Sequence, residues 1–197
     1  MIKFTTVNTE GGWVGLVGSE SGLILLTLPK ISRKSALSKI KGFATDAIED
    51  SSAFGDLPKR LQLYFIGEKV TFPDRLDLGD ATDFDRAVWK ATRSIPYGET
   101  RSYAWVARQC GSPWAYRAVG GALARNPLPI IIPCHRVVAS NGSLGGFGGG
   151  LELKRRLLEL EAGRPGIAGR RRKHDGVSIG CERGLPVLHA HNHEVGG

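Results

Sequence analysis

Apolar and polar positions in the first 30 residues follow the pattern of a small antiparallel sheet. Three segments rich in Thr, Val, Ile and Leu have the composition of strands: Ile2–Thr9, Trp13–Gly18 and Leu23–Pro29. The residues between them, at 10–12 and 19–22, are rich in Gly, Ser and Glu and are typical of tight turns. We therefore expect three consecutive antiparallel strands.

Apolar residues at helical spacing predict two helices after these strands, over roughly Lys34–Glu49 and Leu57–Ile66. Tyr64 and Phe65 fall on the apolar face of the second helix, and we interpret both as core residues without a chemical role. Val70–Phe72 is compatible with a further short strand.

The segment Asp74–Thr82 has no periodicity and is interpreted as a linker. Helical patterns follow it, first over Asp83–Ser94 and finally over Leu151–Glu161. We expect an α+β protein with an N-terminal α/β domain over residues 1–81, built on a small antiparallel sheet. A mostly helical domain over residues 82–162 would follow, and residues 163–197 would form a basic, flexible tail.

Two short helices, Tyr103–Cys110 and roughly Trp114–Ala124, are separated by a three-residue turn that contains Gly111. This is the outline of a helix-turn-helix. The second helix carries Arg117 followed by several small residues, which would let its backbone approach another surface closely. That surface could equally be the body of the protein, and the spacing leaves both alternatives open.

A glycine-rich loop, Ser140–Gly150, precedes the last predicted helix. Its backbone could wrap around a planar ligand, but it lacks the sequence context of a dinucleotide or phosphate loop. In the helix that follows, we expect leucines to face inward and Lys154, Arg155 and Arg156 to face outward.

Composition narrows the class of protein. Hydrophobic residues make up 41% and charged residues 23% of the 197 residues, which is ordinary for a soluble globular protein. No apolar run approaches the length of a membrane helix, and the N-terminus lacks a signal-peptide core. The three irregularly spaced cysteines favour a reducing compartment, so we expect a cytoplasmic location. No Cys-x-x-Cys pair is present, and we expect neither a metal nor a cofactor.

The net charge of +8 and a pI near 9.7 point to a polyanionic partner, nucleic acid before membrane. From Gly163 onward the chain has six basic and three acidic residues, so the body carries +5 of the +8. The body is therefore basic without its tail. A contribution of the tail to DNA affinity is a further expectation.

The most distinctive stretch is an apolar run from Leu128 to Ile132 that leads into Pro133-Cys134-His135. A thiol becomes a good nucleophile when it loses its proton, and a neighbouring imidazole is the usual acceptor. His135 is the only histidine before residue 163. The alternative is an inert buried cysteine beside an incidental histidine.

These motifs resemble the O6-alkylguanine-DNA alkyltransferases, also called methylated-DNA–protein-cysteine methyltransferases. The resemblance rests on Ile132–Val137 (IPCHRV), Arg117–Ala122 (RAVGGA) and Asn126-Pro127. It extends to Ile95–Thr100 (IPYGET) and Ser102-Tyr103, and it covers residues 57 to 163 in all. It implies a ribonuclease H-like N-terminal domain.

The resemblance also implies an activity: DNA repair by direct transfer of the alkyl group of O6-alkylguanine, and less readily of O4-alkylthymine, to Cys134. The base would be flipped out through the minor groove. Displacement by a thiolate leaves a thioether, so each molecule would act once. The implied partner is double-stranded DNA that contains alkylated guanine, bound by a monomer or by several copies side by side, without a membrane, cofactor or metal.

The resemblance assigns catalytic roles to five residues. Cys134 would accept the alkyl group, and His135 would take its proton through a water molecule. Glu161 would orient the imidazole and stabilise its charge. Tyr103 would stack near the base and donate a hydrogen bond to it, and Asn126 would brace the helix-turn-helix against the cysteine segment.

Arg117 would fill the place that the flipped base leaves in the stack, and the small residues after it would lie close in the minor groove. The residues expected to contact DNA are Ser102, Tyr103, Arg117, Ala118, Gly120, Gly121, Ala122, Arg125 and Arg136. Those expected to line the pocket for the base and alkyl group are Trp89, Val137, Phe147, Gly148 and Gly149.

The chain departs from the family pattern at some positions. Phe147-Gly148 stands where some relatives have Tyr-Ser or Tyr-Ala, so a hydroxyl contact to the guanine oxygen is not implied. Phe84-Asp85 stands where glutamine often follows the phenylalanine. Two other functions remain as alternatives: a DNA-binding module that recognises lesions without transfer, and a Cys-His hydrolase of small molecules. The alkyltransferase-like proteins lack the acceptor cysteine, so Cys134 argues against that subclass.

Overall fold

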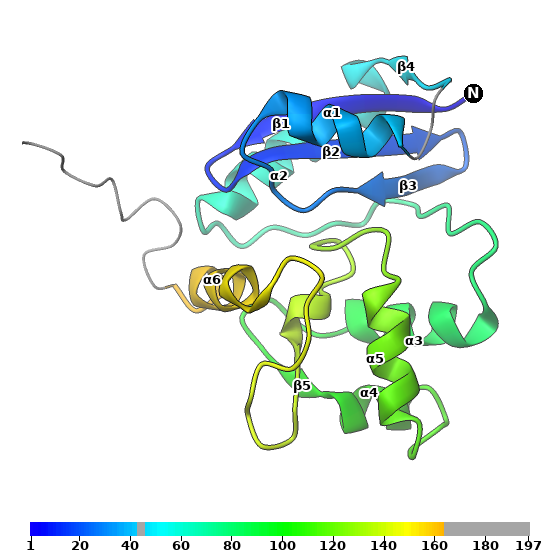
Figure 1. Cartoon of the computed structure of the whole chain (residues 1–197), viewed down its shortest axis with the longest axis vertical. Coiled ribbons are helices and arrows are strands. Elements are labelled where there is room, and N and C mark those ends of the chain that lie inside the picture. Colours follow the sequence, from blue (N-terminus) through cyan, green and yellow to red (C-terminus); the bar gives the residue numbers. More distant parts are fainter. Residues whose placement is uncertain (43–45, 164–197) are drawn as a thin grey trace, which may run out of the picture.

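The computed structural model describes residues 1–42 and 46–163, and its elements form two halves stacked on each other (Figure 1). The sheet half (residues 1–81) contains β1 (Lys3–Thr9), β2 (Gly12–Ser19), β3 (Gly22–Leu26), α1 (Arg33–Lys41), β4 (Ile48–Glu49), a 3-10 turn (Ser51–Phe54) and α2 (Leu57–Phe65). The helical half (residues 82–162) contains α3 (Asp83–Arg93), β5 (Arg101–Ser102), α4 (Tyr103–Gln109), α5 (Tyr116–Ala124), a 3-10 turn (Cys134–Arg136), β6 (Val137–Val138) and α6 (Leu151–Glu161). The predicted α+β class is confirmed.

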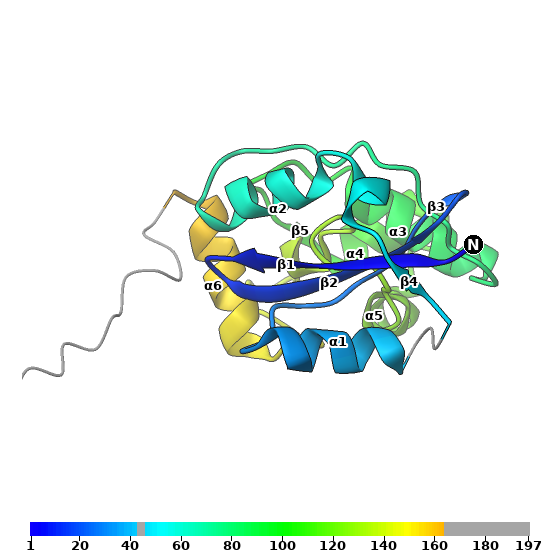
Figure 2. The same ribbon diagram turned by 90° about the horizontal axis from the view of Figure 1, so that it is seen from above.

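The sheet has the strand order β3-β2-β1-β4, with antiparallel pairing of β1 with β2 and of β2 with β3. Helix α1 covers one face and α2 the other, as the view from above shows (Figure 2). Side chains alternate between these faces: Val14 and Leu16 join the main core, whereas Val17 packs with Ile40 of α1. Gly15 permits the close approach of α1, because a Cβ there would lie 2.8 Å from the Ile40 Cδ1 atom.

The first predicted helix is too long. Helix α1 ends at Lys41 rather than Glu49, with Gly42 as its C-terminal cap. Ile48, which falls within the range predicted for that helix, is 51% exposed and belongs to β4. Because β4 pairs parallel to β1, the sheet is mixed rather than purely antiparallel. The crossover from β3 through α1 to β4 is compatible with the ribonuclease H-like arrangement.

The segment after α2 also differs from the prediction. Residues 70–72 form no strand, and Phe72 instead packs edge-to-face against Tyr64. The expected linker follows the edge of β3: the Leu23 N–H donates to the Arg75 carbonyl at 2.8 Å, and the Asp77 N–H donates to the Leu23 carbonyl at 2.8 Å. Backbone hydrogen bonding at a free sheet edge thus orders a segment without any apolar pattern.

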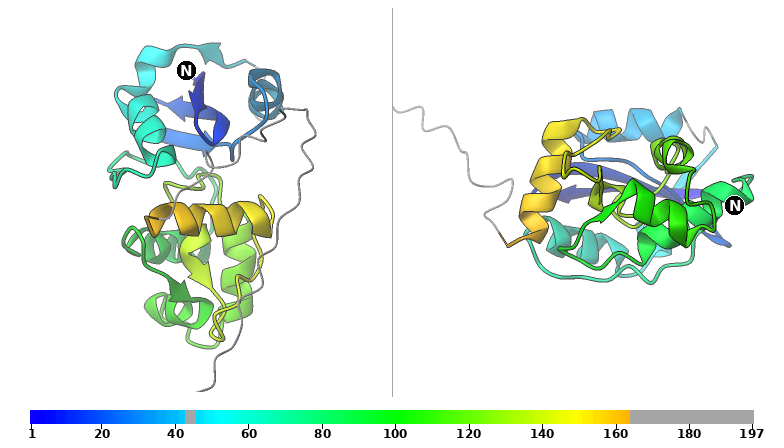
Figure 3. Two further views of the ribbon diagram at one scale, coloured as in Figure 1. Left: turned by 90° about the vertical axis from the view of Figure 1, so that its left-hand side faces the viewer. Right: turned by 90° about the horizontal axis from the view of Figure 1, so that it is seen from below.

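The two halves share one hydrophobic core. A single cluster of buried residues runs from Val14 and Leu61 in the sheet half to Val119 and Leu157 in the helical half. Helix α6 lies across the end of the helical half that faces the sheet half (Figure 3). The position of the predicted domain boundary stays a prediction, and the predicted tail lies outside the described residues apart from its first residue.

The helix-turn-helix outline corresponds to α4 and α5. Ser102 caps α4 by accepting a hydrogen bond from the Trp105 N–H at 3.1 Å. Helix α5 begins at Tyr116, two residues later than expected, which leaves Trp114 in the turn. The two-residue strands β5 and β6 pair in parallel and join the start of α4 to the segment after Cys134.

Candidate active site

Cys134 begins a 3-10 turn at the end of the buried apolar run. Ile130 in this run has a φ of 77°, in the left-handed region that β-branched residues rarely adopt. Such a conformation costs about 1–3 kcal/mol and persists where the surroundings enforce it. Its neighbours Leu128, Ile131 and Ile132 are all buried and hold the turn in place. Rigid packing therefore fixes the position of the thiol.

Asn126 connects the end of α5 to this turn. Its Nδ2 atom donates to the Ile132 carbonyl at 2.9 Å and to Cys134 Sγ at 3.2 Å, and its Oδ1 atom accepts from the Leu128 N–H at 2.9 Å. Burial raises the pKa of the Cys134 thiol, and the Asn126 hydrogen bond opposes this shift only in part. At neutral pH the resting group is therefore a thiol, which must lose its proton before it can attack.

His135 is fully buried, and its Nε2 atom lies 2.7 Å from the Glu161 Oε1 atom. Burial lowers the pKa of His135 despite this carboxylate, so the imidazole is neutral at pH 7. The Nδ1 atom has no hydrogen-bond partner among the described residues. If Nε2–H donates to Glu161, Nδ1 carries a free lone pair and can accept a proton.

Arg136 does not lie where a DNA contact requires it. Its side chain is buried, with Nε 2.8 Å and Nη2 3.0 Å from the two Glu161 oxygens, and Nη1 donates to the Ile95 carbonyl at 2.7 Å. The prediction that Arg136 contacts DNA is therefore wrong. Its permanent charge instead neutralises Glu161, which helps to keep His135 neutral.

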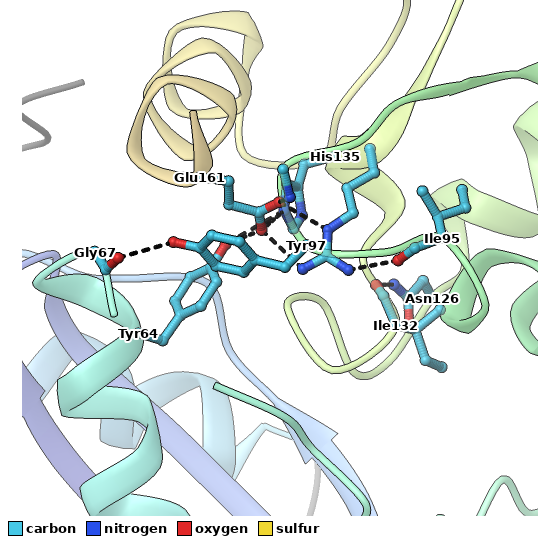
Figure 4. A network of polar contacts seen from close by, with 10 residues as sticks. Tyr64, Gly67, Ile95, Tyr97, Asn126, Ile132, His135 and Glu161 are labelled. Atoms are coloured by element: carbon cyan, nitrogen blue, oxygen red, sulfur yellow. Dashed lines mark hydrogen bonds and ion pairs between the residues drawn. The ribbon is translucent and has the colours of Figure 1, made fainter. Parts of the chain in front are cut away.

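Glu161 is the centre of this network (Figure 4). Besides His135 and Arg136, it accepts from the Tyr64 hydroxyl at 2.7 Å and from the Gly98 N–H at 3.1 Å. Burial alone would raise the pKa of Glu161, but the hydrogen bond to His135 and the hydrogen bonds and charge of Arg136 outweigh it and lower the pKa to about 2. The carboxylate therefore stays charged and fixes the imidazole ring.

Tyr64 is a site residue that sequence reasoning missed. Its hydroxyl, besides donating to Glu161, lies 3.3 Å from His135 Nε2, and its ring is fully buried in the main core. One feature of the sequence could have indicated this role: a tyrosine at a core position of a helix has a buried hydroxyl, which needs a hydrogen-bond partner. Through Tyr64, helix α2 of the sheet half supports the catalytic pair (Figure 4).

Lys154 is the second missed residue, and the prediction that it faces outward is wrong. Its side chain is fully buried, and Nζ donates to the carbonyls of Val137 at 2.6 Å, Gly146 at 3.3 Å and Leu144. Burial lowers the pKa of Lys154 to about 8. The ammonium thus ties the glycine-rich loop to β6, and its charge favours a thiolate at Cys134.

Replacing Lys154 by methionine is expected to reduce the free energy of unfolding by about 1–3 kcal/mol, because buried carbonyls lose their donor. The loop should also loosen and alkyl transfer should slow. Urea unfolding and single-turnover kinetics measure the two effects. Arg155→Met is the matched control, since among the described residues Arg155 pairs only with exposed Glu152 and should contribute under about 1 kcal/mol. Equal effects of both variants would contradict the role of Lys154.

A cavity of about 770 Å³ opens in front of Cys134. Its lining residues are Tyr103, Ala104, Tyr116, Arg117, Gly120, Leu123, Ala124, Cys134, Ala139, Ser140, Gly145, Gly146, Phe147 and Gly148. Phe147 and Gly148 line it as expected. Tyr103 does so too, with its hydroxyl 3.5 Å from the Gly146 carbonyl, and burial raises its pKa, so that the phenol remains a donor.

Three residues predicted to line this pocket do not. Trp89 is buried beneath α5 and donates from Nε1 to the Ala122 carbonyl at 2.9 Å. Val137 is fully buried in the main core. Gly149 faces α6, where a Cβ would lie 2.7 Å from the Leu153 Cδ2 atom. These three residues therefore contribute to packing within the fold rather than to the wall of the cavity.

Helix α5 presents Arg117 and Ala118 to solvent and leaves Gly120 and Gly121 half-buried. Ala122 is fully buried, so the prediction that it contacts DNA is wrong. The helix period explains this, because a residue five positions after Arg117 lies on the opposite side. Of the small residues after Arg117, Ala122 therefore packs against the body of the protein, whereas Ala118 faces solvent.

Arg125 caps the end of α5 and pairs with buried Asp85 of α3 at 2.6 Å. This pair explains the aspartate at a position where relatives often have glutamine. The guanidinium remains largely exposed and can still face a phosphate. Around it the chain is basic: between Glu99 and Glu152 there is no acidic residue, while five arginines occur at 101, 108, 117, 125 and 136.

Comparisons with known proteins agree with this geometry. A family model described as "6-O-methylguanine DNA methyltransferase, DNA binding domain" matches residues 83–163. The methylated-DNA–protein-cysteine methyltransferase of Mycobacterium tuberculosis is 44% identical over 164 residues, which is 83% of this chain and 94% of that protein. That of Methanosarcina barkeri is 43% identical, over 80% of this chain and 96% of that protein. The chain belongs to the methylated-DNA–protein-cysteine methyltransferase family.

Solved structures extend the agreement to the whole fold. The crystal structure of M. tuberculosis OGT in complex with DNA superposes with a TM-score of 0.71 at 42% identity, covering 84% of this chain and 96% of that one. The methyltransferase of Pyrococcus kodakaraensis, at 24% identity and a TM-score of 0.63, covers 82% of this chain and 99% of that one and shows the same fold. The α+β fold expected from the motifs is thereby confirmed in the first half as well.

Membership of this family confirms the main functional prediction. The chain is a methylated-DNA–protein-cysteine methyltransferase that repairs DNA by transferring the alkyl group of O6-alkylguanine to a cysteine. Within the described residues, no helix is both long and apolar enough to cross a membrane.

Proposed function

We propose that Cys134 is the alkyl acceptor and that His135 and Glu161 activate it. One observation carries the proposal: Cys134 faces the cavity, and the adjacent His135 is held by Glu161 through Nε2 while Nδ1 stays free to take a proton. Cys110, the other free cysteine of the described chain, lies at the end of α4 and is not among the residues that line this cavity.

The reaction follows from these groups. The Cys134 proton passes, through a water molecule, to His135 Nδ1, and Glu161 stabilises the imidazolium. The thiolate attacks the alkyl carbon in line, so that an S–C bond forms as the O6–C bond breaks. The guanine leaves with the bonding electrons, and the Tyr103 hydroxyl donates a hydrogen bond to the developing charge. A thioether is not readily cleaved, so each molecule acts once.

The substrate is double-stranded DNA that contains O6-alkylguanine, with O4-alkylthymine a poorer one. The base is extruded through the minor groove into the cavity, and Arg117 fills the space that it leaves. Exposed Arg117 and Ala118, with the half-buried glycines after them, supply the small and basic surface that this mode needs. The protein acts in the cytoplasm as a monomer, with several copies able to bind along one duplex.

Mass spectrometry after mixing the protein with excess O6-methylguanine DNA tests the proposal. We expect a mass gain of one CH2 per molecule, mapped to the peptide that contains Cys134. Intact lesions with an unmodified protein that still binds DNA would instead indicate a lesion-sensing module. Continued turnover without DNA would indicate a hydrolase.

Replacing Arg117 by alanine is expected to weaken binding to lesion-containing duplex and to slow transfer from DNA. Loss of one phosphate-neutralising contact reduces the slope of log K against log salt by about 1, whereas loss of a stacking wedge leaves the slope unchanged. Fluorescence anisotropy across a salt series measures both quantities. Binding equal to the wild type at every salt concentration would contradict a DNA role for Arg117.

A further inference from the structure

The turn before α5 carries an aromatic feature that the repair mechanism does not use. Trp114 is 88% exposed and Tyr116 is 47% exposed. Six other large hydrophobic residues of the described chain are between 38% and 98% exposed, and all of them are aliphatic: Met1, Ile2, Ile31, Ile48, Ile66 and Leu151. The exposed large aromatics of the described chain therefore lie together, in this turn and at the first residue of α5, directly before Arg117. Exposed aromatic surface of this kind is unfavourable in water and marks interaction sites.

We propose that Trp114 and Tyr116 form an aromatic contact surface for the DNA strand that carries the lesion, in addition to Arg117. Trp114 packs against the nucleotides that flank the extruded base, and Tyr116 packs against the extruded nucleotide at the mouth of the cavity. The inference rests on the proposed binding of DNA by α5.

The position of Tyr116 follows from the helix period. Tyr116, Gly120 and Leu123 are spaced by four and three residues, so they share one face of α5, and all three line the cavity in front of Cys134. Tyr116 starts the helix, lines the cavity and is 47% exposed, so its ring borders both the cavity and solvent.

Trp114 continues this surface beyond the cavity. It lies in the turn between α4 and α5, just outside the helix, and is not among the residues that line the cavity. The nearest charged residues along the chain are Arg108 and Arg117, and no acidic residue lies between Glu99 and Glu152. Arginines together with aromatic rings suit a polyanion that has flat apolar surfaces between its charges. An acidic protein surface would match only the arginines, and an aliphatic one only the aromatic rings.

Nucleic acid offers both features, because each phosphate is followed by a sugar and a base with a π-face. Aromatic contacts with bases are tolerant of sequence, and apolar wedges stabilise partly unstacked minor-groove DNA. The aromatic surface would therefore stabilise the distorted duplex around the lesion without adding sequence preference. It neutralises no phosphate, so it leaves the salt dependence of binding unchanged.

The test compares Trp114→Ala and Trp114→Phe in the full-length chain with Cys134→Ala, so that binding is measured without transfer. The duplex is short and carries one O6-methylguanine. Loss of one aromatic contact of about 1.4 kcal/mol corresponds to about tenfold weaker binding, which we expect for Trp114→Ala. Trp114→Phe keeps an aromatic ring and should bind within about twofold of its parent. Tyr116→Ala should weaken binding in the same way.

Ile31→Ala is the matched control. It removes a 98% exposed apolar side chain from the sheet half and should not change the affinity for DNA.

A second measurement separates DNA contact from damage to the site. With Cys134 intact, the rate of alkylation by O6-benzylguanine as a free base needs the cavity but no DNA. For Trp114→Ala this rate should equal that of the wild type, while transfer from DNA slows. The slope of log K against log salt should also be unchanged.

Three outcomes would overturn the inference. The first is an unchanged affinity of Trp114→Ala and Tyr116→Ala for the short duplex. In the second, alkylation by the free base falls in parallel with transfer from DNA, which would mean that Trp114 acts through the fold. In the third, Trp114→Ala weakens binding only on duplexes long enough for several copies, which would mean that the turn contacts another protein molecule. A wild type that gains no alkyl group while Trp114→Ala still binds more weakly would reject the proposed transfer to Cys134 and leave the aromatic surface in place.

Discussion

Replacing Cys134 with alanine is expected to abolish alkyl transfer completely while leaving DNA binding intact. In the proposed mechanism Cys134 supplies the only atom that receives the alkyl group, so no residual pathway remains after its removal. The thiol is small and accepts one hydrogen bond, from Asn126 at 3.2 Å, and the alanine methyl fits the same space. The variant should therefore fold, bind lesion-containing duplex and leave every lesion unrepaired.

The measurement pairs intact-mass analysis of the protein with analysis of the O6-methylguanine that remains in the DNA. Cys110→Ala is the matched control, because Cys110 is also a free cysteine of the helical half, and it should still gain one CH2. Transfer by Cys134→Ala, or its loss in Cys110→Ala with a normal fold, would show that the acceptor is misassigned.

Sequence reasoning succeeded where a side chain's chemistry and its neighbours along the chain carry the information. The Pro-Cys-His motif identified the thiol and imidazole, and the structure places them at the cavity and on Glu161. Glu161 lies 26 residues from His135, and the family resemblance rather than any local pattern predicted their pairing. The strands β1 to β3 were found because their alternation and turns are local.

The failures at polar and charged residues have one physical cause: sequence alone does not tell which polar side chains are buried. Lys154 and Arg136 were placed outside because charged residues rarely lack solvent contact. In the fold each satisfies buried acceptors: Lys154 binds loop carbonyls, and Arg136 binds Glu161. Tyr64 was placed in the core correctly, but its hydroxyl partner, Glu161, lies 97 residues away. Long-range hydrogen bonds of this kind leave no local periodicity.

The electrostatic design of the site depends on this buried network. Burial raises the pKa of Cys134 and lowers that of His135, so both are neutral at rest. Glu161, by contrast, remains charged because the hydrogen bonds to His135 and Arg136 and the charge of Arg136 outweigh its burial. In the proposed mechanism, proton transfer from the thiol to the imidazole places the new positive charge beside an existing negative one.

Replacing Glu161 with alanine is therefore expected to damage both stability and catalysis. Removing one partner of a buried ion pair leaves an uncompensated charge, here the Arg136 guanidinium, and typically costs about 3–5 kcal/mol in free energy of unfolding. Tyr64 and the Gly98 N–H lose their acceptor as well. Loss of general-base assistance should slow transfer by about 10²–10⁴-fold. Glu159→Ala, on the same helix but outside the network, should stay within about 0.5 kcal/mol of the wild type.

The dependence of stability on pH separates the charge of Glu161 from its shape. Because its pKa in the folded state is lowered from 4.5 to about 2, its stabilising effect is complete above pH 4.5 and is lost as the pH falls toward 2. The shift corresponds to about 3 kcal/mol. His135, whose pKa is also lowered, adds a further loss of stability as the pH falls below 6.5.

Glu161→Gln keeps the shape of the side chain but cannot titrate. Urea unfolding should therefore show that its free energy of unfolding falls less steeply toward acid pH than that of the wild type. Parallel declines in the two proteins would mean that other carboxylates dominate acid unfolding. Even in that case, slow transfer at pH 7 by a stably folded Glu161→Gln variant would show that the carboxylate is needed to orient His135.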